Sequence, residues 1–432
     1  MQTRFRATPV EAMPLSHRAS GVPPRFVEYG YYCSIFYAIL APVLGLSVGF
    51  LGAGILAVLA VLCVLYLGPR AITFYSRIFF PLGCALSLIL LQILFHDESL
   101  FGENVRPFVT WLLALIVVQS LSLRQGFLQR FGVAVFLIGL MLLPYLRMDY
   151  VNTVGFQRVG LKEGVGLANP NDLAAWFGFC ALYFTITGIE TSRITVRTVA
   201  WLVTVGCLYV VGLTVSRGTL LAFAITSVVA LRRLLKRGFL PLLLFCILCW
   251  VLYESGVFDR MATSYITRAT DETGRFLVWP LVIERFLQAP FLGVGVSDMY
   301  TYVPAISHAI TPHNGFLYVA LASGIVPLVF LVGYWWRAAR GAFHAQGAPT
   351  AEAPFCLPLL IYAFLATLEG NLPFMNPWAI VALAIAIAAD SSYRVRGTVL
   401  HRRTWDARAR HMHRRDRDAL AAHQLQYLPP RS

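Results

Sequence analysis

The sequence predicts an all-α, polytopic membrane protein, and two features of its composition lead to that prediction. Of the 432 residues, 58% are hydrophobic and only 13% are charged, whereas soluble domains carry about a quarter charged residues. The apolar residues also fall in long runs of the length that crosses a bilayer as a helix. Helices are expected because unpaired backbone groups are too costly in hydrocarbon, and the long runs do not fit the short alternating strands of a membrane barrel.

Twelve apolar segments of the chain are candidate membrane spans. They are 28–46, 49–68, 76–96, 107–123, 131–147, 171–188, 196–214, 218–232, 238–257, 314–336, 354–371 and 376–391. The first two form one run split near glycines, and the last two are divided at Asn371–Pro377, so the count at both ends stays open. We expect a transmembrane domain at 28–391 between polar tails at 1–27 and 392–432.

The distribution of basic residues predicts how the spans are oriented. With the N-terminus in the cytoplasm, the inside segments hold 26 of the 35 lysines and arginines, and every short inside loop holds at least two. Short loops rich in Lys and Arg stay in the cytoplasm, so both termini are expected there. The Arg-rich tail then anchors the topology and contacts anionic lipid headgroups. Trp405 is the only aromatic residue between Arg394 and Arg417, too few for the interleaved pattern of a nucleic-acid-binding segment, so nucleic-acid binding is not expected.

Two outside loops are long enough to carry a site. They span 147–170 and 258–313, and the second contains an apolar stretch at 276–293 that predicts a helix lying in the membrane interface, bent at Pro280. Such a helix can gate a cavity that opens to lipid, although a simple connector fits the same pattern. The eight cysteines all fall in apolar segments and are expected to be small buried hydrophobic residues.

Cations at the outer edges of the spans are the first candidate site residues. The chain has no Walker motif, no GxGxxG and no zinc-binding pattern, so neither a cofactor nor a metal is expected. Ser216-Arg217-Gly218 interrupts two apolar runs, and an arginine at the membrane boundary is costly enough to indicate a function. A snorkelling arginine that ends a helix is the alternative. Arg275, Arg158 and Lys162 lie in the outside loops. Several such cations suit a polyanionic headgroup such as pyrophosphate.

Polar residues before two of the spans complete the candidate set. His313, in Thr311-Pro312-His313-Asn314-Gly315, is a candidate general base, because an unperturbed imidazole titrates near neutrality. Capping a helix or contacting a headgroup is the simpler role. Asn169 and Asn171 precede the sixth span and fit equally well as helix caps or as carbohydrate contacts.

In their order along the chain, these motifs resemble those of the bacterial O-antigen ligase and polymerase superfamily. The matching pieces are Asn169-Pro170-Asn171, Ser216-Arg217-Gly218, Gly274-Arg275 with Trp279 and the later Pro290, Gly293 and Gly295, and His313-Asn314 with Gly324. The ligase pattern normally continues with Gly, Thr or Tyr three residues after that glycine, where this chain has Pro327. The resemblance covers roughly residues 165–330, and the remaining spans match only in character.

The resemblance implies a glycosyltransferase-C-like membrane fold in the bacterial inner membrane and an enzyme that needs neither ATP nor metal. Members of the ligase branch transfer a glycan from undecaprenyl pyrophosphate to lipid A–core on the periplasmic face. It further implies that His313 is the base and that Arg217 and Arg275 clamp the pyrophosphate. Ser216, Trp279, Asn314, Asn169 and Asn171 are then expected to bind substrate, with Arg158 and Lys162 as weaker phosphate contacts.

Two other functions remain compatible with the sequence. An O-antigen polymerase would join two lipid-linked glycans with the same residues. A transporter of lipid-linked glycans would have similar spans, but it predicts ionisable residues at mid-membrane and an internal repeat, and we find no clear repeat and almost no charge inside the spans.

Overall fold

The computed structural model describes most of the membrane domain. The described residues are 23–41, 51–67, 71–100, 102–150, 157–161, 169–235, 254, 275–303, 308–346, 348, 350–370 and 376–389. Both predicted tails beyond residues 23 and 389 lie outside this set, as do Lys162, Cys246, Cys249 and all but one residue of the predicted span 238–257.

The structure is mostly helical, as the composition predicts. The long helices are α1 (Arg25–Leu40), α2 (Leu51–Leu67), α3 (Ala71–Phe95), α4 (Arg106–Leu121), α5 (Phe127–Leu142), α6 (Pro170–Glu190), α7 (Ile194–Leu213), α8 (Arg217–Leu235), α11 (Arg275–Gln288), α12 (Gly315–Ser323), α13 (Ile325–Ala345) and α14 (Ala353–Leu368). A further apolar helix follows at Pro377–Ala389. Most predicted spans coincide with one of these helices to within a few residues.

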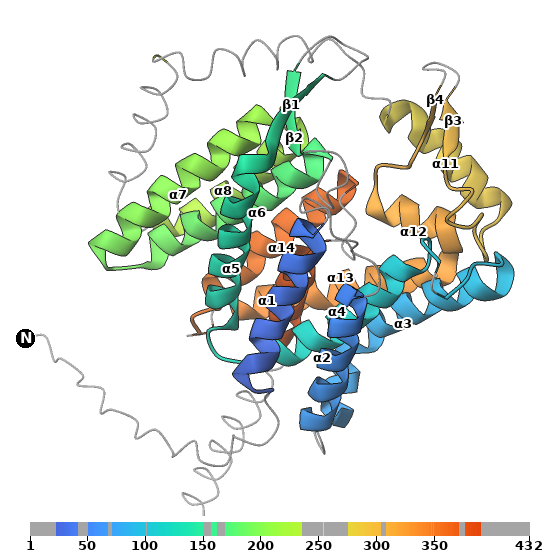
Figure 1. Ribbon diagram of the computed structural model, residues 1–432, viewed down its shortest axis with the longest axis horizontal. Coiled ribbons are helices and arrows are strands. Elements are labelled where there is room, and N and C mark those ends of the chain that lie inside the picture. Colours follow the sequence, from blue (N-terminus) through green and yellow to red (C-terminus); the bar gives the residue numbers. More distant parts are fainter. Residues whose placement is uncertain are drawn as a thin grey trace, which may run out of the picture.

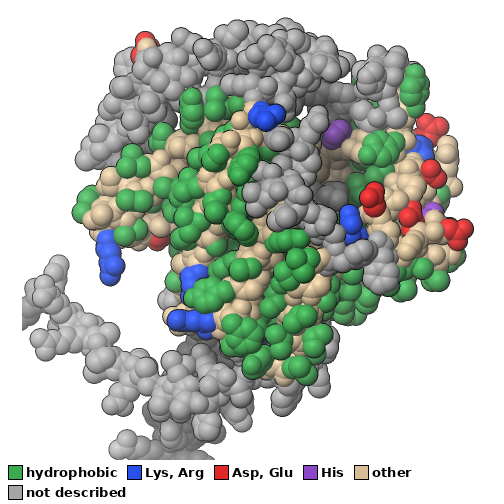
Figure 2. Space-filling model, viewed as in Figure 1, with side chains coloured by type: hydrophobic (Ala, Val, Ile, Leu, Met, Phe, Trp, Pro, Cys, Tyr) green, Lys and Arg blue, Asp and Glu red, His purple; other side chains and the backbone are tan. Residues whose placement is uncertain are grey.

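Several helices have the length and composition to cross a membrane. Four described helices meet both criteria, Arg77–Phe95, Phe127–Tyr145, Pro170–Glu190 and Ile194–Leu213, and shorter apolar helices accompany them. Large apolar side chains on outer helix faces are exposed, among them Leu65 (71%), Ile194 (70%) and Val228 (70%). Figure 2 shows hydrophobic side chains over much of the bundle surface and acidic side chains gathered around α11 and the end of α3. Long apolar helices with exposed apolar faces are typical of a polytopic membrane protein. The predicted count of twelve spans stays a prediction.

α6 is the central helix of the bundle. Nearly all of its residues from Leu173 to Ile189 are buried, and it packs against α7, α8 and α14. Gly178 lets α8 and α14 approach closely, because a side chain there would overlap the Tyr362 hydroxyl and press on Thr219. The Tyr362 hydroxyl donates to the Ala175 carbonyl at 2.9 Å, which fixes α14 against α6.

Two β-hairpins, which the sequence analysis did not predict, occupy the predicted outside loops. β1 (Leu146–Tyr150) pairs antiparallel with β2 (Gln157–Leu161), and β3 (Thr301–Val303) pairs with β4 (His308–Ile310). Figure 1 shows both hairpins at the top of the molecule, the second one beside α11. The strands are too short to show a pattern in sequence, and they give the loops a defined backbone.

A helix is present in the predicted segment as α11, with Pro280 inside it, and its place in the membrane interface stays a prediction. One face of α11 packs through Val278 and Val282 in a small core that Leu321 and Ala322 of α12 share. Arg285 of α11 donates to the carbonyls of Asp298 and Tyr300 at 2.8 and 3.0 Å. α11 is therefore packed onto α12 and the β3–β4 hairpin.

The predicted span 314–336 is two helices, because the chain breaks at Gly324 between α12 and α13. Gly324 has a φ of 79°, and a side chain there would overlap the backbone of Phe291. Gly293, with a φ of 72°, lies equally close to the backbone of Leu321–Ser323. The loop after α11 and the α12–α13 break therefore pack backbone to backbone, which only glycine permits. This contact explains why both positions, Gly293 and Gly324, hold glycine in this chain.

The long helices give the bundle two distinct ends. At one end, called here the Glu28 end, α1, α5 and α14 begin: Arg130 of α5 binds Glu28 of α1, and Glu352 before α14 binds Gly126 before α5. At the other, the Arg217 end, α6 and α8 begin and α14 finishes. α14 has 16 residues, so the two ends are separated by about 24 Å. This is comparable to the hydrocarbon thickness of a bilayer.

Candidate active site

Arg217 is the first residue of α8. The positive end of the helix dipole lies there and adds to the positive potential of the guanidinium. The turn before it strains the backbone, because the β-branched Val215 has a φ of 53°. Ser216 is buried and its hydroxyl donates to Thr219 at 3.2 Å. The side chain of Arg217 is half-exposed. A guanidinium at a helix N-terminus favours an anionic ligand. Ser216 thus fixes the start of the helix, and its predicted role in binding substrate stays a prediction.

His313 lies in a second strained turn, directly before α12. Its φ is 47°, a conformation that non-glycine residues rarely adopt. Asn314 is the N-cap of α12, and its side-chain oxygen accepts from the backbone of Phe316 and Leu317 at 3.0 and 3.2 Å. The Trp279 indole donates to the Pro312 carbonyl at 2.9 Å. Asn314 and Trp279 therefore hold the His313 backbone in place. His313 itself is half-exposed.

The end of α14 brings these two turns together. Gly370 has a φ of 99°, and a side chain at this position would lie 3.1 Å from the Cα atom of His313. The preceding residue, Glu369, places its carboxylate directly on Gly218, the neighbour of Arg217. The Glu369–Gly370 pair thus contacts both motifs at once. The Arg217 and His313 turns, about a hundred residues apart in sequence, meet across it.

Glu369 is not among the site residues that the sequence predicts. A signal for it was present, because Glu369 is an ionisable residue at the edge of an apolar run, and the same rule that selected Arg217 applies to it. Glu369 lies near the end of the predicted span 354–371, just before the Asn371–Pro377 segment that divides the last two spans. Its place beside Arg217 depends on the packing of α14 against α8, which the sequence does not reveal.

Arg275 is the first residue of α11, one helical turn before Trp279. Residues four apart in a helix lie on the same face with their Cβ atoms about 5–6 Å apart. Since Trp279 binds the residue before His313, position 275 shares the helix face that is directed toward the candidate site. The structure describes the backbone of Arg275 and not its side chain, so its role as a phosphate clamp stays a prediction.

The remaining predicted residues are Asn169 and Asn171 at the start of α6, which lies at the Arg217 end, and Arg158 and Lys162. Asn169 is the N-cap of α6, and its side chain accepts from the backbone nitrogen of Asn171 at 2.9 Å. Capping is thus observed for the asparagine motif, and its predicted contact with substrate stays a prediction. Arg158 lies in β2 opposite Asp149, with its side chain outside the described set, and Lys162 also falls outside it.

An apolar groove opens beside the candidate site. It has a volume of about 560 Å³, lies between α12, α13 and α14, and is lined entirely by apolar residues. Phe316 and Leu368 belong to its wall; the first follows His313 by three residues and the second directly precedes Glu369. Trp336, another wall residue, is 72% exposed. The groove thus offers a long apolar ligand a path from the lipid-exposed surface to the polar cluster.

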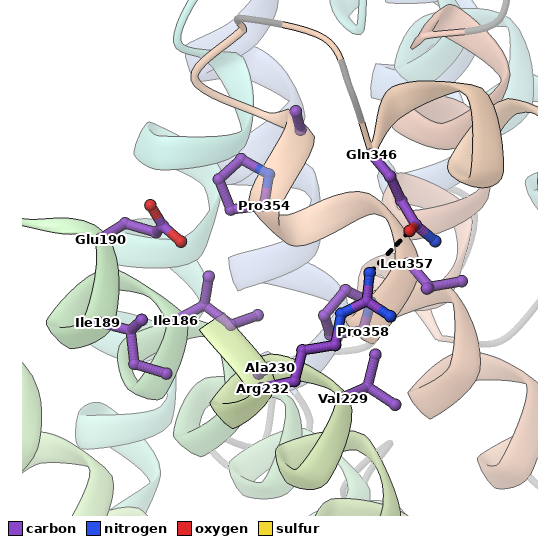
Figure 3. A pocket seen from close by; sticks show the side chains of 11 residues that line it. Ile186, Ile189, Glu190, Val229, Ala230, Arg232, Gln346, Pro354, Leu357 and Pro358 are labelled. Atoms are coloured by element: carbon purple, nitrogen blue, oxygen red, sulfur yellow. Dashed lines mark hydrogen bonds between the residues drawn. The ribbon is translucent and has the colours of Figure 1, made fainter. Parts of the chain in front are cut away.

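A pocket at the Glu28 end of α8 does not suit a substrate. Figure 3 shows Arg232 hydrogen-bonded to Gln346 at 2.8 Å, with Glu190 projecting from α6 on the other side. The enclosed space is about 10 Å³, room for roughly one water molecule. It lies about 22 Å along α8 from Arg217, by the rise of a helix.

Comparison with known families agrees with the resemblance of the motifs. Residues 202–332 match the O-antigen ligase family, a segment that runs from α7 into α13 and includes Arg217, Arg275 and His313. None of the curated proteins matches the chain. The match supports membership of the O-antigen ligase and polymerase superfamily for the segment that carries these three residues.

Proposed function

We propose that the protein is an O-antigen ligase, which transfers a glycan from undecaprenyl pyrophosphate to lipid A–core in lipopolysaccharide biosynthesis. The observation that supports this most directly is the meeting of His313, Arg217 and Glu369 at one end of the bundle. A base and a cation near one another are what glycosyl transfer from a diphosphate requires.

The proposed reaction is a single displacement. The acceptor hydroxyl attacks the anomeric carbon, and the bond from that carbon to the diphosphate oxygen breaks. The proton of the hydroxyl moves to the imidazole of His313, and Arg217 and Arg275 stabilise the charge that develops on the departing diphosphate. Guanidinium groups can supply this stabilisation without a metal ion. We assign Glu369 the role of holding the site's charges in place, since its carboxylate lies against the start of α8.

The apolar groove supports a lipid-linked donor. An isoprenoid chain has no polar groups, and the groove presents none to it. Burying such a chain is favourable by about 25 cal/mol per Å² of apolar surface. Because the groove wall ends at Phe316 and Leu368, a chain lying in it would present its diphosphate head beside Arg217. The donor would enter sideways from the bilayer.

The distribution of arginines supports a periplasmic site. Arg25, Arg124, Arg130 and Arg232 all lie at the Glu28 end or next to it, and basic residues mark the cytoplasmic side of membrane proteins. The Arg217 end would then face the periplasm, where both lipid-linked substrates are presented.

Transfer in vitro tests the proposed activity. Purified full-length protein would be mixed with lipid-linked glycan and lipid A–core, with and without a chelator of divalent metals. We expect glycan-bearing lipid A–core in both reactions. Product that forms only without the chelator would exclude a metal-free mechanism. The absence of product in both reactions would exclude the ligase function.

A gene deletion separates the ligase from the polymerase. If the protein is a ligase, the deletion strain should lose all long glycan from lipid A and accumulate lipid-linked polymer. A polymerase would instead leave lipid A–core bearing a single repeat. Pro327, which departs from the ligase pattern, makes this comparison necessary.

A further inference from the structure

A second cationic pocket lies at the Glu28 end, far from the candidate active site. Its volume is about 370 Å³, and three arginines line it: Arg25 at the start of α1, Arg124 in the turn between α4 and α5, and Arg130 in α5. Figure 2 shows basic side chains gathered at the lower left of the bundle, near the ends of α1 and α5 that Figure 1 places there. The proposed reaction uses none of these residues.

A buried carboxylate holds two of these arginines in place. Glu28 is 1% exposed and receives two hydrogen bonds from Arg130, at 2.6 and 2.9 Å. The Nε atom of Arg124 lies 3.3 Å from the same carboxylate, and its Nη1 donates to the Pro23 carbonyl at 2.6 Å. Both guanidinium groups are therefore fixed before any ligand arrives, and a ligand that binds them loses less conformational freedom.

The pocket keeps an excess of positive charge after this pairing. Three guanidinium groups and the Glu28 carboxylate leave a net charge of two. Glu352 lies nearby, where it accepts from the backbone of Gly126 at 3.3 Å; counting it, the net charge is still one. Arg124 and Arg130 retain partial exposure, 21% and 34% of their side chains. An anion with several acceptor oxygens would complement both the charge and the remaining N–H donors.

The surroundings of the pocket favour an anion that carries hydrocarbon chains. Phe26 and Tyr29, on the outward side of α1 next to Arg25, are 52% and 53% exposed. Aromatic side chains at such a level of a membrane helix lie among the lipid headgroups. A phosphate held by the three arginines would thus have apolar protein surface directly beside it. Basic pockets between helices on the cytoplasmic side are suited to anionic lipid headgroups.

We propose that Arg25, Arg124 and Arg130 form a binding site for the phosphate headgroup of an anionic phospholipid in the leaflet opposite the active site. Its acyl chains lie along α1, and its headgroup bridges α1 to the α4–α5 turn. This site is separate from the groove that we assign to the lipid-linked donor.

Lipid binding to the full-length protein tests the proposal. The delipidated protein in detergent would be titrated with cardiolipin, with phosphatidylethanolamine and with inorganic pyrophosphate, and bound species counted by native mass spectrometry. We expect one cardiolipin to bind at least tenfold more tightly than phosphatidylethanolamine. Displacement of that cardiolipin by equimolar pyrophosphate would overturn the lipid assignment in favour of a site for free phosphate.

Variants locate the binding. The pair Arg25→Gln with Arg124→Gln removes two of the three cations and keeps the Glu28–Arg130 pair, so folding is retained. Arg193→Gln is the matched control, because Arg193 is an exposed arginine on the predicted cytoplasmic side outside the pocket. We expect about a tenfold loss of cardiolipin affinity for the double variant and none for the control. Equal losses, or no loss in either, would show that the lipid binds elsewhere. A circular-dichroism melting curve for each variant confirms that the fold compared is the same.

Discussion

The two ends of the bundle use charged residues in opposite ways. At the Glu28 end, Glu28 and Arg130 lie on regular helices and form an ion pair. The Arg130 Nε atom lies 2.6 Å from the Glu28 Oε1 atom. At the Arg217 end, charged and titratable residues lie on or beside turns with left-handed backbone, at Val215, His313 and Gly370. Paired charges on regular helices hold a structure together. Strained turns that carry half-exposed side chains cost stability, and such turns persist mainly where they serve a function.

Replacing His313 should give the largest effect on activity. We expect His313→Asn to lower glycan transfer by about 100-fold or more, since general base catalysis contributes that much. Asparagine adopts the left-handed backbone that position 313 requires, so the turn is preserved and the loss reports on the imidazole. Initial rates of transfer in vitro measure the effect. Normal lipopolysaccharide ladders from this variant would exclude His313 as the base.

Replacing Arg217 tests the cation beside it. Arg217→Ala should lower transfer by about 100-fold, comparable to the removal of one group that stabilises a developing oxyanion. The Michaelis constant for the lipid-linked donor should rise more than that for lipid A–core. Arg217→Lys should restore part of the activity, because the charge returns without the bidentate fork. Equal weakening of donor and acceptor would contradict a diphosphate clamp, and the same test applies to Arg275→Ala.

Glu369 and Glu352 offer a direct comparison of the two ends, since they flank the same helix, α14. We expect Glu369→Gln to lower transfer by roughly 10-fold, because it removes a charge that lies on the start of α8. Glu352→Gln should leave transfer unchanged within twofold. The measurement is the transfer rate of each purified variant, normalised to the amount of folded protein. If both variants behave alike, the proximity of Glu369 to Gly218 has no catalytic meaning.

The Glu28 end should show the complementary result, a loss of stability without a loss of function. Glu28→Gln leaves Arg124 and Arg130 without their common partner. Removing one member of a buried ion pair costs about 3–5 kcal/mol, and since these arginines are partly exposed we expect about 2 kcal/mol here. The thermal unfolding midpoint in detergent should fall, with transfer per folded molecule unchanged. An unaltered midpoint would mean that the pair contributes nothing.

Much of the fold could be predicted from the sequence, because the bilayer leaves the chain few choices. Lipid forces each long apolar run into a helix, so each helix from α3 to α8 overlaps a predicted span, with ends that differ by at most about five residues. The break at Gly324 was missed, since α12 and α13 are both apolar and the reason for the break is the backbone of Phe291, which lies against it. The hairpins were missed because three to five residues carry no reliable period.

From its amino-acid sequence, the chain offered Arg217 and His313 as candidates: Arg217 because a cation at the edge of an apolar run is costly, and His313 because an imidazole titrates near neutrality. The tertiary structure brings the two turns together, because Glu369 and Gly370 contact both of them. It also showed that Ser216, Asn314 and Trp279 bind other parts of the protein and hold the site. Local chemistry selects residues that can react, but their distance in space depends on how distant helices pack, which local sequence does not encode.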